Sequence, residues 1–362
     1  MWADILLNYS VFILEVITLL VIIAVIFGVI FTLKQKNHNK TGELRITNLN
    51  AQYEDQQQVL KAFRLDEQQA KQLAKSRKKQ EKAEAKAAKK KAKQLEKGAV
   101  EQSESDLFSQ QKPCLFVLDF QGDIQASATN ALREELNAIL AVARPEKDEV
   151  LLRLESPGGV VHGYGFAASQ LQRLRERGIP LTVAVDKVAA SGGYMMACVA
   201  DKIVAAPFAI LGSIGVVAQV PNIHRLLKKH DVDVDVMTAG EYKRTVTMLG
   251  ENTEKGKQKF QQELEETHQL FKQFVAEHRP QVAIEQVATG EHWFGKQALS
   301  LALVDEIKTS DDVILQALAE KDVLQVKYCV KKSLAQKLGK QAEESAANVV
   351  EKAFYQQRNL FF

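Results

Sequence analysis

From Pro113 to Ile307, short apolar runs alternate with stretches in which apolar residues recur every three or four positions. Apolar runs of about four to eight residues between turn residues are typical of buried strands, whereas the wider spacing is typical of helices with one apolar face. The pattern therefore predicts an α/β body with a largely parallel sheet. The expected strands are Cys114–Phe120, Glu149–Glu155, Leu181–Val185, Lys202–Ala205, Val216–Val220 and Val232–Met237, and the expected helices are Ala128–Val142, Phe166–Arg177, Tyr194–Val199 and 253–278.

The N-terminal part of the chain has a different pattern. Residues 16–33 are eighteen consecutive positions without a charged side chain, and a helix of that length spans about 27 Å, close to the hydrocarbon thickness of a bilayer. The alternative is a cleaved signal peptide, but Met1–Asp4 carry no positive side chain and no small-x-small cleavage site follows. We therefore predict a retained transmembrane anchor at residues 1–33, with membrane lipid as the partner of residues 5–33.

A Lys-rich segment follows the anchor. Residues 71–97 hold twelve Lys or Arg and three Glu, so a local charge of +9 is concentrated in a chain whose formal net charge is only +3. Residues 55–97 consist mainly of strong helix formers and predict a long solvated helix. We interpret it as a soluble spacer; a contact with anionic headgroups or nucleic acid is the alternative, and nucleic acid is not the expected partner. The expected organisation is an anchor at 1–33, a helical spacer and flexible joint at 34–112, the α/β body at 113–325 and a helical tail at 326–362.

Three cysteines, Cys114, Cys198 and Cys329, cannot all pair with one another, and none lies in a C-x-x-C or Cys/His ligand spacing. A disulfide scaffold and a structural zinc site are therefore not expected. We expect each cysteine to behave as a small apolar residue.

Two glycine-containing motifs lie where an expected strand gives way to an expected helix. In Glu155–Gly159, two glycines permit a sharp turn and bring backbone N–H groups toward a ligand, as stabilisation of an oxyanion requires. In Ala189–Tyr194, Ser191 begins an apolar helix with its hydroxyl exposed. Taken singly, the first motif is more typical of an ordinary turn and the second of a capping serine.

A nucleophilic serine needs a base. The histidines at positions 162, 224, 230, 268, 278 and 292 lie in no recognisable motif with a carboxylate. Lys243 lies in Gly240–Arg244, and a desolvated lysine can be neutral and accept the serine proton. Read alone, Lys243 would be a surface lysine, and only the combination with the other motifs favours a catalytic role.

Together, the motifs resemble those of the signal peptide peptidase A family of serine peptidases, in the same order along the chain. The resemblance covers about Pro113–Ile307 and rests on Ser156–Gly159, Ala190–Tyr194, Gly212–Val216 and Gly240–Arg244. It implies the ClpP/crotonase-like fold of repeated ββα and βα units, an acyl-enzyme mechanism without cofactor or metal, and hydrolysis of peptides or unfolded and membrane-derived proteins. By position it implies Ser191 as nucleophile, Lys243 as general base, Ser213 as the group orienting the lysine, and Gly158 or Gly159 with Gly192 as the oxyanion hole.

Two departures from the family pattern lie toward the end of the body. The family often has an Arg near Glu291–His292, and it has Gly-Leu-Val-Asp where this chain has Ala302–Asp305. Both positions are remote in sequence from the serine and lysine motifs. We therefore expect them to affect substrate fit and packing more than chemistry.

The resemblance also implies a homo-oligomer and a location in a bacterial inner membrane. The side of the membrane is open, because the lysines that follow residue 33 favour a cytoplasmic body while the family favours the periplasm. Two alternative functions differ in class. One is a crotonase-like acyl-CoA enzyme, which needs neither the serine–lysine pair nor an anchor, and the other is a non-enzymatic membrane scaffold with a basic helix.

Overall fold

The computed structural model describes residues 42–66 and 112–330, together with Ile17, Thr18, Gln69, Lys82 and Lys86. The rest of the predicted anchor, most of the Lys-rich segment and the tail from residue 331 lie outside the described residues. In the described part of the chain, no helix is both long enough and apolar enough to cross a membrane. The chain divides into two compact units, one formed by 1–44 and 328–362 and the other by 45–327.

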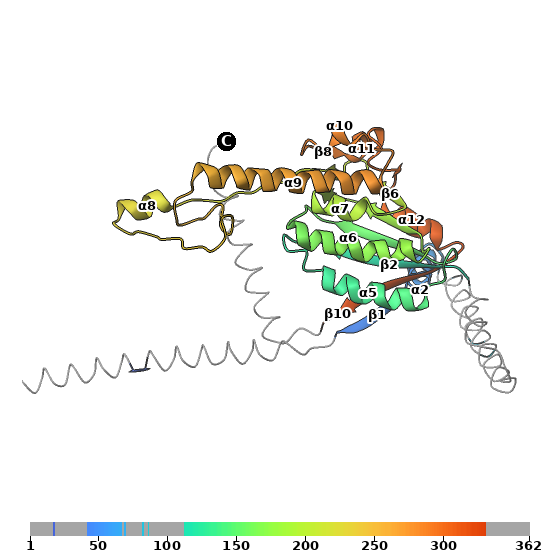
Figure 1. The fold of residues 1–362 in the computed structure, drawn as a ribbon. Helices are drawn as coiled ribbons and strands as arrows, with labels where there is room; N and C mark the ends of the chain where they lie inside the picture. Colours follow the sequence, from blue (N-terminus) through green and yellow to red (C-terminus); the bar gives the residue numbers. More distant parts are fainter. Residues whose placement is uncertain are drawn as a thin grey trace, which may run out of the picture. The chain divides into compact units, whose positions relative to one another are not determined.

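A seven-stranded sheet forms the centre of the fold (Figure 1), and the pairings from β10 through β9 are all parallel. The parallel α/β prediction is therefore confirmed. Three predicted strands have the expected bounds, and the first is longer by one residue. In sheet order the strands are β1 (Glu43–Asn48), β10 (Asp322–Cys329), β2 (Cys114–Gln121), β3 (Glu149–Glu155), β4 (Leu181–Val185), β6 (Lys202–Ala205) and β9 (Glu306–Ile307).

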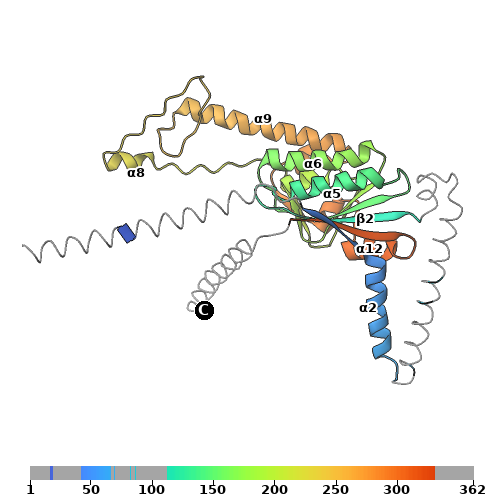
Figure 2. The same ribbon diagram turned by 90° about the horizontal axis from the view of Figure 1, so that it is seen from below.

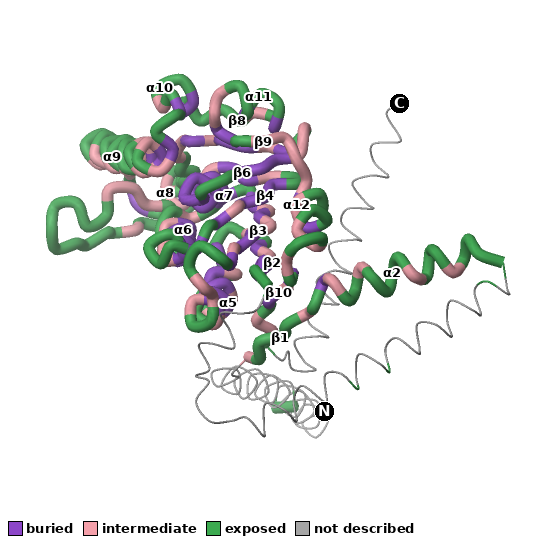
Figure 3. Tube along the Cα trace, turned by 90° about the vertical axis from the view of Figure 1, so that its right-hand side faces the viewer, coloured by how far each residue is buried: buried purple, intermediate pink, exposed green. Residues whose placement is uncertain are grey.

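Helices cover both faces of this sheet (Figure 3). Along β2, Phe116 and Leu118 belong to one buried apolar cluster, whereas Leu115 and Val117 belong to another. Alternate residues of a strand point to opposite faces, so a parallel strand that is covered on both sides reads as a continuous apolar run. One face carries α5 (Thr129–Val142), α6 (Val161–Glu176), α7 (Gly192–Ala197) and α9 (Glu254–His278), and the other carries α2 (Leu49–Phe63) and α12 (Ser310–Ala317).

The stretch assigned to the spacer contains a strand, β1, that the sequence analysis did not include, and a helix, α2, that begins six residues before the predicted helical stretch 55–97. β1 joins the sheet beside β10, and α2 follows it directly. Asn48 caps α2 through its side-chain oxygen, and the Asn50 side chain accepts from the Val323 N–H at 2.7 Å. The Asn50 contact joins residues 273 positions apart, so the helix-forming composition alone could not reveal it. β10 also runs four residues beyond the expected end of the body at residue 325.

A second, three-stranded sheet is formed by β5 (Val188–Ala190), β7 (Ile210–Gly212) and β8 (His292–Phe294). β5 and β7 are parallel, and β8 is antiparallel to β7. Ser156, just after β3, forms a parallel bridge with Ala189 of β5. The small sheet therefore continues from the carboxyl end of a central strand. Two short helices, α10 (Ile284–Val287) and α11 (Gly295–Ser300), flank β8 in sequence.

Residues 217–250, called the arm below, connect β7 to α9 and extend beyond the large sheet with α8 (His224–Lys229) (Figures 1 and 2). The predicted strands Val216–Val220 and Val232–Met237 are wrong, because neither forms strand structure. Most of their side chains are exposed, and a β-forming sequence makes a stable strand only when a neighbouring strand and a packed face are available.

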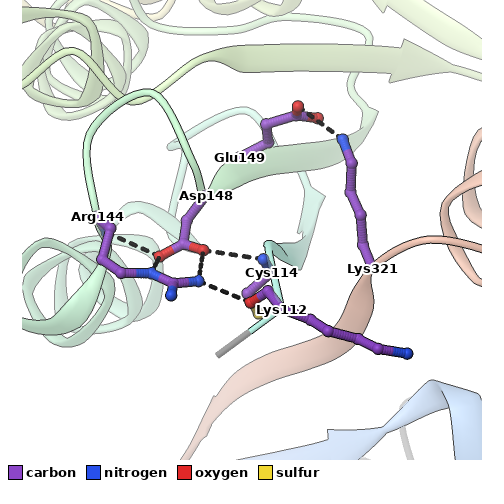
Figure 4. Close-up of polar contacts among 6 residues, drawn as sticks. All are labelled: Lys112, Cys114, Arg144, Asp148, Glu149 and Lys321. Carbon is purple, nitrogen blue, oxygen red and sulfur yellow. Dashed lines mark hydrogen bonds and ion pairs between the residues drawn. The ribbon is translucent and has the colours of Figure 1, made fainter. Parts of the chain in front are cut away.

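At the amino ends of β2 and β3, a buried carboxylate joins the two strands to α5 (Figure 4). Asp148 accepts from the Cys114 N–H at 2.8 Å and from the Arg144 guanidinium at 2.6 and 2.9 Å. Nearby, Glu149 pairs with Lys321 at 2.6 Å. Burial alone would raise the pKa of Asp148, but its hydrogen bonds with Arg144 and Cys114 hold that pKa below its ordinary value.

All three cysteines are free. Cys114 and Cys198 are buried among apolar residues, which confirms the expectation for them, whereas Cys329 is half-buried. Burial raises the pKa of the Cys114 thiol to about 12. Such a thiol is a weak nucleophile at neutral pH.

Candidate active site

Ser191 occupies the single residue between β5 and α7. Its backbone has φ 52° and ψ −118°, a conformation that residues other than glycine rarely adopt. The Ser191 N–H donates to the Gly212 carbonyl at 2.8 Å, and its own carbonyl accepts from the Met195 N–H at 3.0 Å. The turn is thus held from both sides. A strained serine at a strand-to-helix turn has the geometry of a nucleophile elbow.

The loop formed by residues 156–159, called the Gly158 loop below, lies directly against this turn. A Cβ added to Gly158 would lie 2.7 Å from the Ser191 Cβ and 2.9 Å from the Gly192 nitrogen, and the φ of Gly158 is +92°. Only glycine, which has no Cβ, can adopt this positive φ and allow this close approach without strain. The loop is fixed because Ser156 donates its N–H to Val188 and accepts from the Ala190 N–H. The two glycine motifs, about thirty residues apart in sequence, therefore form one site.

The structure distinguishes the two glycines of this loop. Gly158 is buried, and its N–H donates inward to the Ser156 Oγ at 3.1 Å. Gly159 is exposed, and no hydrogen bond is found for its N–H among the described residues. The Gly192 N–H lies in the first turn of α7, where helix N–H groups lack a helical acceptor. Gly159 and Gly192 therefore have N–H groups for which no acceptor is found among the described residues, whereas the Gly158 N–H has one.

Ser213 lies beside Ser191. Ala190 and Gly212 are register partners on the parallel strands β5 and β7, so the residues that follow them, Ser191 and Ser213, leave the small sheet side by side. Ser213 also has a positive φ, 53°, and its N–H donates to the Glu291 carbonyl at 2.6 Å. Three of the four motifs are thus brought together.

Lys243 is the predicted site residue that the structure does not bring to the serine. It lies on the arm with its side chain exposed, and its N–H donates to Gly240 at 3.2 Å. The residues before it contact the start of α9: Glu241 forms an ion pair with Lys255, and the Tyr242 ring lies 5.6 Å from the Lys259 ammonium. The role of Lys243 as a base stays a prediction.

The two departures from the family pattern are remote from the motifs in sequence but contact them in the fold, and their effect on substrate fit and packing stays a prediction. The Glu291 backbone holds Ser213, as described above. Tyr194 of α7 donates its buried hydroxyl to the Leu303 carbonyl at 2.9 Å, and Ala302 has φ 58°, a conformation suited to glycine.

An ion pair between the buried Arg279 and the more exposed Asp305 supports the same segment. Arg279 donates to both oxygens of Asp305 at 2.7 and 2.9 Å and to the Ala302 carbonyl at 3.1 Å. Burial raises the pKa of Asp305, but the hydrogen bonds from Arg279 and from the Ile203 N–H leave it lowered overall. Sequence reasoning missed Arg279, because this residue belongs to no motif. It also missed Tyr164 of α6, whose hydroxyl lies 2.6 Å from the Ser156 Oγ, for the same reason. Among the residues that the structure describes, no cluster of three or more His, Cys, Asp or Glu could hold a metal ion.

Comparison with known proteins identifies the family. Residues 4–171 match the model of the peptidase family S49 N-terminal region, and residues 173–324 match the model of peptidase family S49. The chain is 64% identical to the "Probable protease SohB" of Haemophilus influenzae over 96% of each chain. It is 48% identical to the protein of the same name from Buchnera aphidicola of Schlechtendalia chinensis, over 86% of this chain and 99% of that one.

A solved membrane-bound stomatin-specific protease covers 63% of this chain and 96% of its own, at 13% identity and a TM-score of 0.37, which is too low to add to the assignment. The two family models and the nearly full-length identity are sufficient. The chain belongs to peptidase family S49, the signal peptide peptidase A family that its motifs resemble.

Proposed function

We propose that this chain is a membrane-anchored serine endopeptidase in which Ser191 is the nucleophile and Lys243 the general base. One observation carries the proposal: Ser191 adopts a strained conformation at a strand-to-helix turn, directly against the Gly158–Gly159 loop. Strained backbone conformations cluster at active sites, so the strain at Ser191 supports a functional role for this residue. The S49 family assignment supports peptide hydrolysis as the reaction.

The proposed reaction has two steps. Neutral Lys243 accepts the proton of the Ser191 hydroxyl as the Oγ attacks the peptide carbonyl carbon, and the N–H groups of Gly159 and Gly192 donate to the oxyanion. The C–N bond then breaks, the leaving amine takes the proton from Lys243, and an ester to Ser191 remains. Water hydrolyses this ester by the reverse sequence of proton transfers. Ser213, beside Ser191, orients the lysine amine.

The position of Lys243 leads us to propose that two copies of the chain complete each site. Lys243 is an exposed residue of the arm, which extends beyond the large sheet. The arm also exposes large apolar side chains, including Val217 at 83% and Met237 at 90%. Several large apolar side chains exposed on one projecting segment support a protein interface there. In a homo-oligomer, the arm of one copy would bring its lysine to the serine of another.

The proposed substrates rest on the glycine loops of the site, and the proposed location rests on the N-terminal sequence. We propose peptides and unfolded or membrane-derived proteins as substrates, because the glycine loops bind backbone groups and read no particular side chain. The uncharged segment 16–33 supports an N-terminal anchor in a bacterial inner membrane, with residues 5–33 in contact with lipid. The relatives compared above are bacterial proteins, which supports a bacterial source for this chain.

The test uses full-length chain purified in detergent and a denatured fluorescent protein as substrate. Ser191→Ala and Lys243→Ala should each lower the cleavage rate by about a thousandfold or more, because the two groups act as a unit. Lys228→Ala is the matched control, since Lys228 is another exposed lysine of the arm, and it should cleave at the wild-type rate. Equal activity in the three variants and the wild type would contradict the dyad.

A mixture of the two inactive variants tests whether the dyad forms between copies. After dissociation and reassembly at equal amounts, about a quarter of the sites would combine an intact Ser191 with an intact Lys243, so about a quarter of the wild-type rate should return. No recovery, although exchange of subunits is verified by differently tagged copies, would mean that both groups come from one chain.

A further inference from the structure

A chain of buried hydroxyl groups lies behind the Gly158 loop. The Tyr164 hydroxyl donates to the Asp123 carbonyl at 2.8 Å and lies 2.6 Å from the Ser156 Oγ. The Ser156 Oγ in turn accepts from the Gly158 N–H at 3.1 Å. Both side chains are fully buried, so water does not compete for these bonds.

The proton positions in this chain are determined by its two ends. The Tyr164 proton is committed to the Asp123 carbonyl, so the tyrosine oxygen can only accept from Ser156. The Ser156 proton is therefore committed to Tyr164, which leaves its oxygen to accept from Gly158. All the hydrogen bonds run in one direction, from the Gly158 N–H to the Asp123 carbonyl. A hydroxyl that donates a hydrogen bond becomes a better acceptor, so each bond strengthens the one before it. The peptide before Gly158 is thus fixed in one orientation.

The Tyr164 ring supports the other half of the site. A Cβ added to Gly192 would lie 2.4 Å from the Tyr164 Cγ, so the ring lies directly against the backbone that follows Ser191. One side chain of α6 therefore contacts both segments that supply N–H groups to the proposed oxyanion hole. Its hydroxyl holds the Gly158–Gly159 loop, and its ring holds the start of α7.

We propose that Tyr164, acting through Ser156, is a positioning residue that sets the geometry of the oxyanion hole. The proposal rests on the proposed peptidase function and deepens it. With the Gly158 N–H bonded inward, the next peptide presents the Gly159 N–H outward at a fixed angle to the Gly192 N–H. Loss of the tyrosine hydroxyl leaves the Ser156 proton without its acceptor, so the Ser156 hydroxyl no longer holds the Gly158 N–H in one orientation. Stabilisation of the oxyanion should fall, whereas binding of an uncleaved peptide should not.

The test compares a peptide aldehyde with the amide of the same peptide as inhibitors of the full-length enzyme. The aldehyde carbon forms a bond with the Ser191 Oγ, the serine proton passes to the base, and the former carbonyl oxygen occupies the oxyanion hole; the amide binds without this bond. Tyr164→Phe keeps the ring against Gly192 and removes only the hydroxyl. We expect kcat to fall about tenfold and the aldehyde to bind about tenfold more weakly, with KM and amide binding unchanged.

Two further variants make the result specific. Ser156→Ala should show the same pattern, and the double variant should lose little more than the worse single variant, because the two hydroxyls belong to one chain of bonds. Tyr194→Phe is the matched control: it removes another buried tyrosine hydroxyl that donates to a backbone carbonyl, that of Leu303, and it should leave the ratio of aldehyde to amide binding unchanged.

The outcomes separate this inference from the function on which it rests. A wild-type chain that neither cleaves peptides nor binds the aldehyde better than the amide would overturn the peptidase function. An active wild-type chain whose aldehyde-to-amide ratio is the same in Tyr164→Phe and Ser156→Ala would overturn the positioning role alone. An equal shift in Tyr194→Phe would also overturn it, since the effect would then be a general consequence of losing a buried hydroxyl.

Discussion

Ala302 carries backbone strain near the candidate site. Its φ of 58° is a left-handed conformation that costs an L-residue about 1–2 kcal/mol. A glycine avoids this cost but loses about 0.4–1 kcal/mol through the greater entropy of the unfolded chain. Because the first effect is the larger, Ala302→Gly should raise the free energy of unfolding by about 0.5–1 kcal/mol, as measured by urea denaturation of the full-length chain in detergent.

The control for this prediction is the same substitution where the backbone is helical. Ala131 lies inside α5, and Ala131→Gly should lower the free energy of unfolding by about 1 kcal/mol. If both variants lose stability to the same degree, the strain at Ala302 does not exist in solution.

At the level of single residues, the site could be predicted where chemistry is written into a motif. Ser191, Gly158 and Gly192 lie where strand patterns end, and glycine pairs beside serine are uncommon enough to draw attention. Tyr164 could not be found this way, because it occupies an apolar position of a helix and its hydroxyl meets Ser156 only in the folded chain. The surroundings of Lys243 could not be predicted either, because they depend on the path of the arm in the folded chain.

At the level of elements, Asp148 joins α5 to the amino ends of β2 and β3. Because the folded-state pKa of Asp148 is lowered, its ionised form contributes stability above the unfolded-state pKa near 4, and this contribution is lost as the pH falls through the folded-state value. Asp148→Asn should cost about 3 kcal/mol at pH 7, because it leaves Arg144 without its buried partner. The variant should also lose less stability than the wild type between pH 5 and the acid transition, where stability is followed by urea denaturation.

The neighbouring pair in Figure 4 is the matched control. Glu149 and Lys321 are more exposed than Asp148 and Arg144, so Glu149→Gln should cost less than about 1 kcal/mol. If both substitutions lower the free energy of unfolding equally, burial does not determine how much the Asp148 contacts stabilise the fold.

The elements themselves were predictable to different degrees, for physical reasons. The central strands are covered on both faces, so their sequences are almost wholly apolar and have clear ends. In the arm, Val232–Met237 alternates like a strand, but no neighbouring strand pairs with it. β1 was missed for the opposite reason: its side chains are mostly exposed, and its place in the sheet depends on pairing with a distant strand.

At the level of the larger unit, the parallel arrangement explains how motifs far apart in sequence form one site. The carboxyl ends of parallel strands lie at the same edge of a sheet, and loops at that edge are the usual place for ligands. Ser156–Gly159 follows β3, and its bridge to β5 places it against the Ser191 turn. The Asp148 contacts lie at the opposite, amino-terminal ends of the same strands. Stability and chemistry therefore occupy different edges of the sheet.

The central claim is that Ser191 carries the acyl group during turnover. It is tested most directly by mixing the full-length chain with an activated peptide ester, quenching with acid during turnover, and locating the acyl group by mass spectrometry of the digested protein. We predict that the acyl group is on Ser191, that it is absent from Ser191→Ala, and that it accumulates more slowly in Lys243→Ala. An acyl group on another side chain while Ser191 is unmodified, or turnover without any acylated residue, would contradict the account.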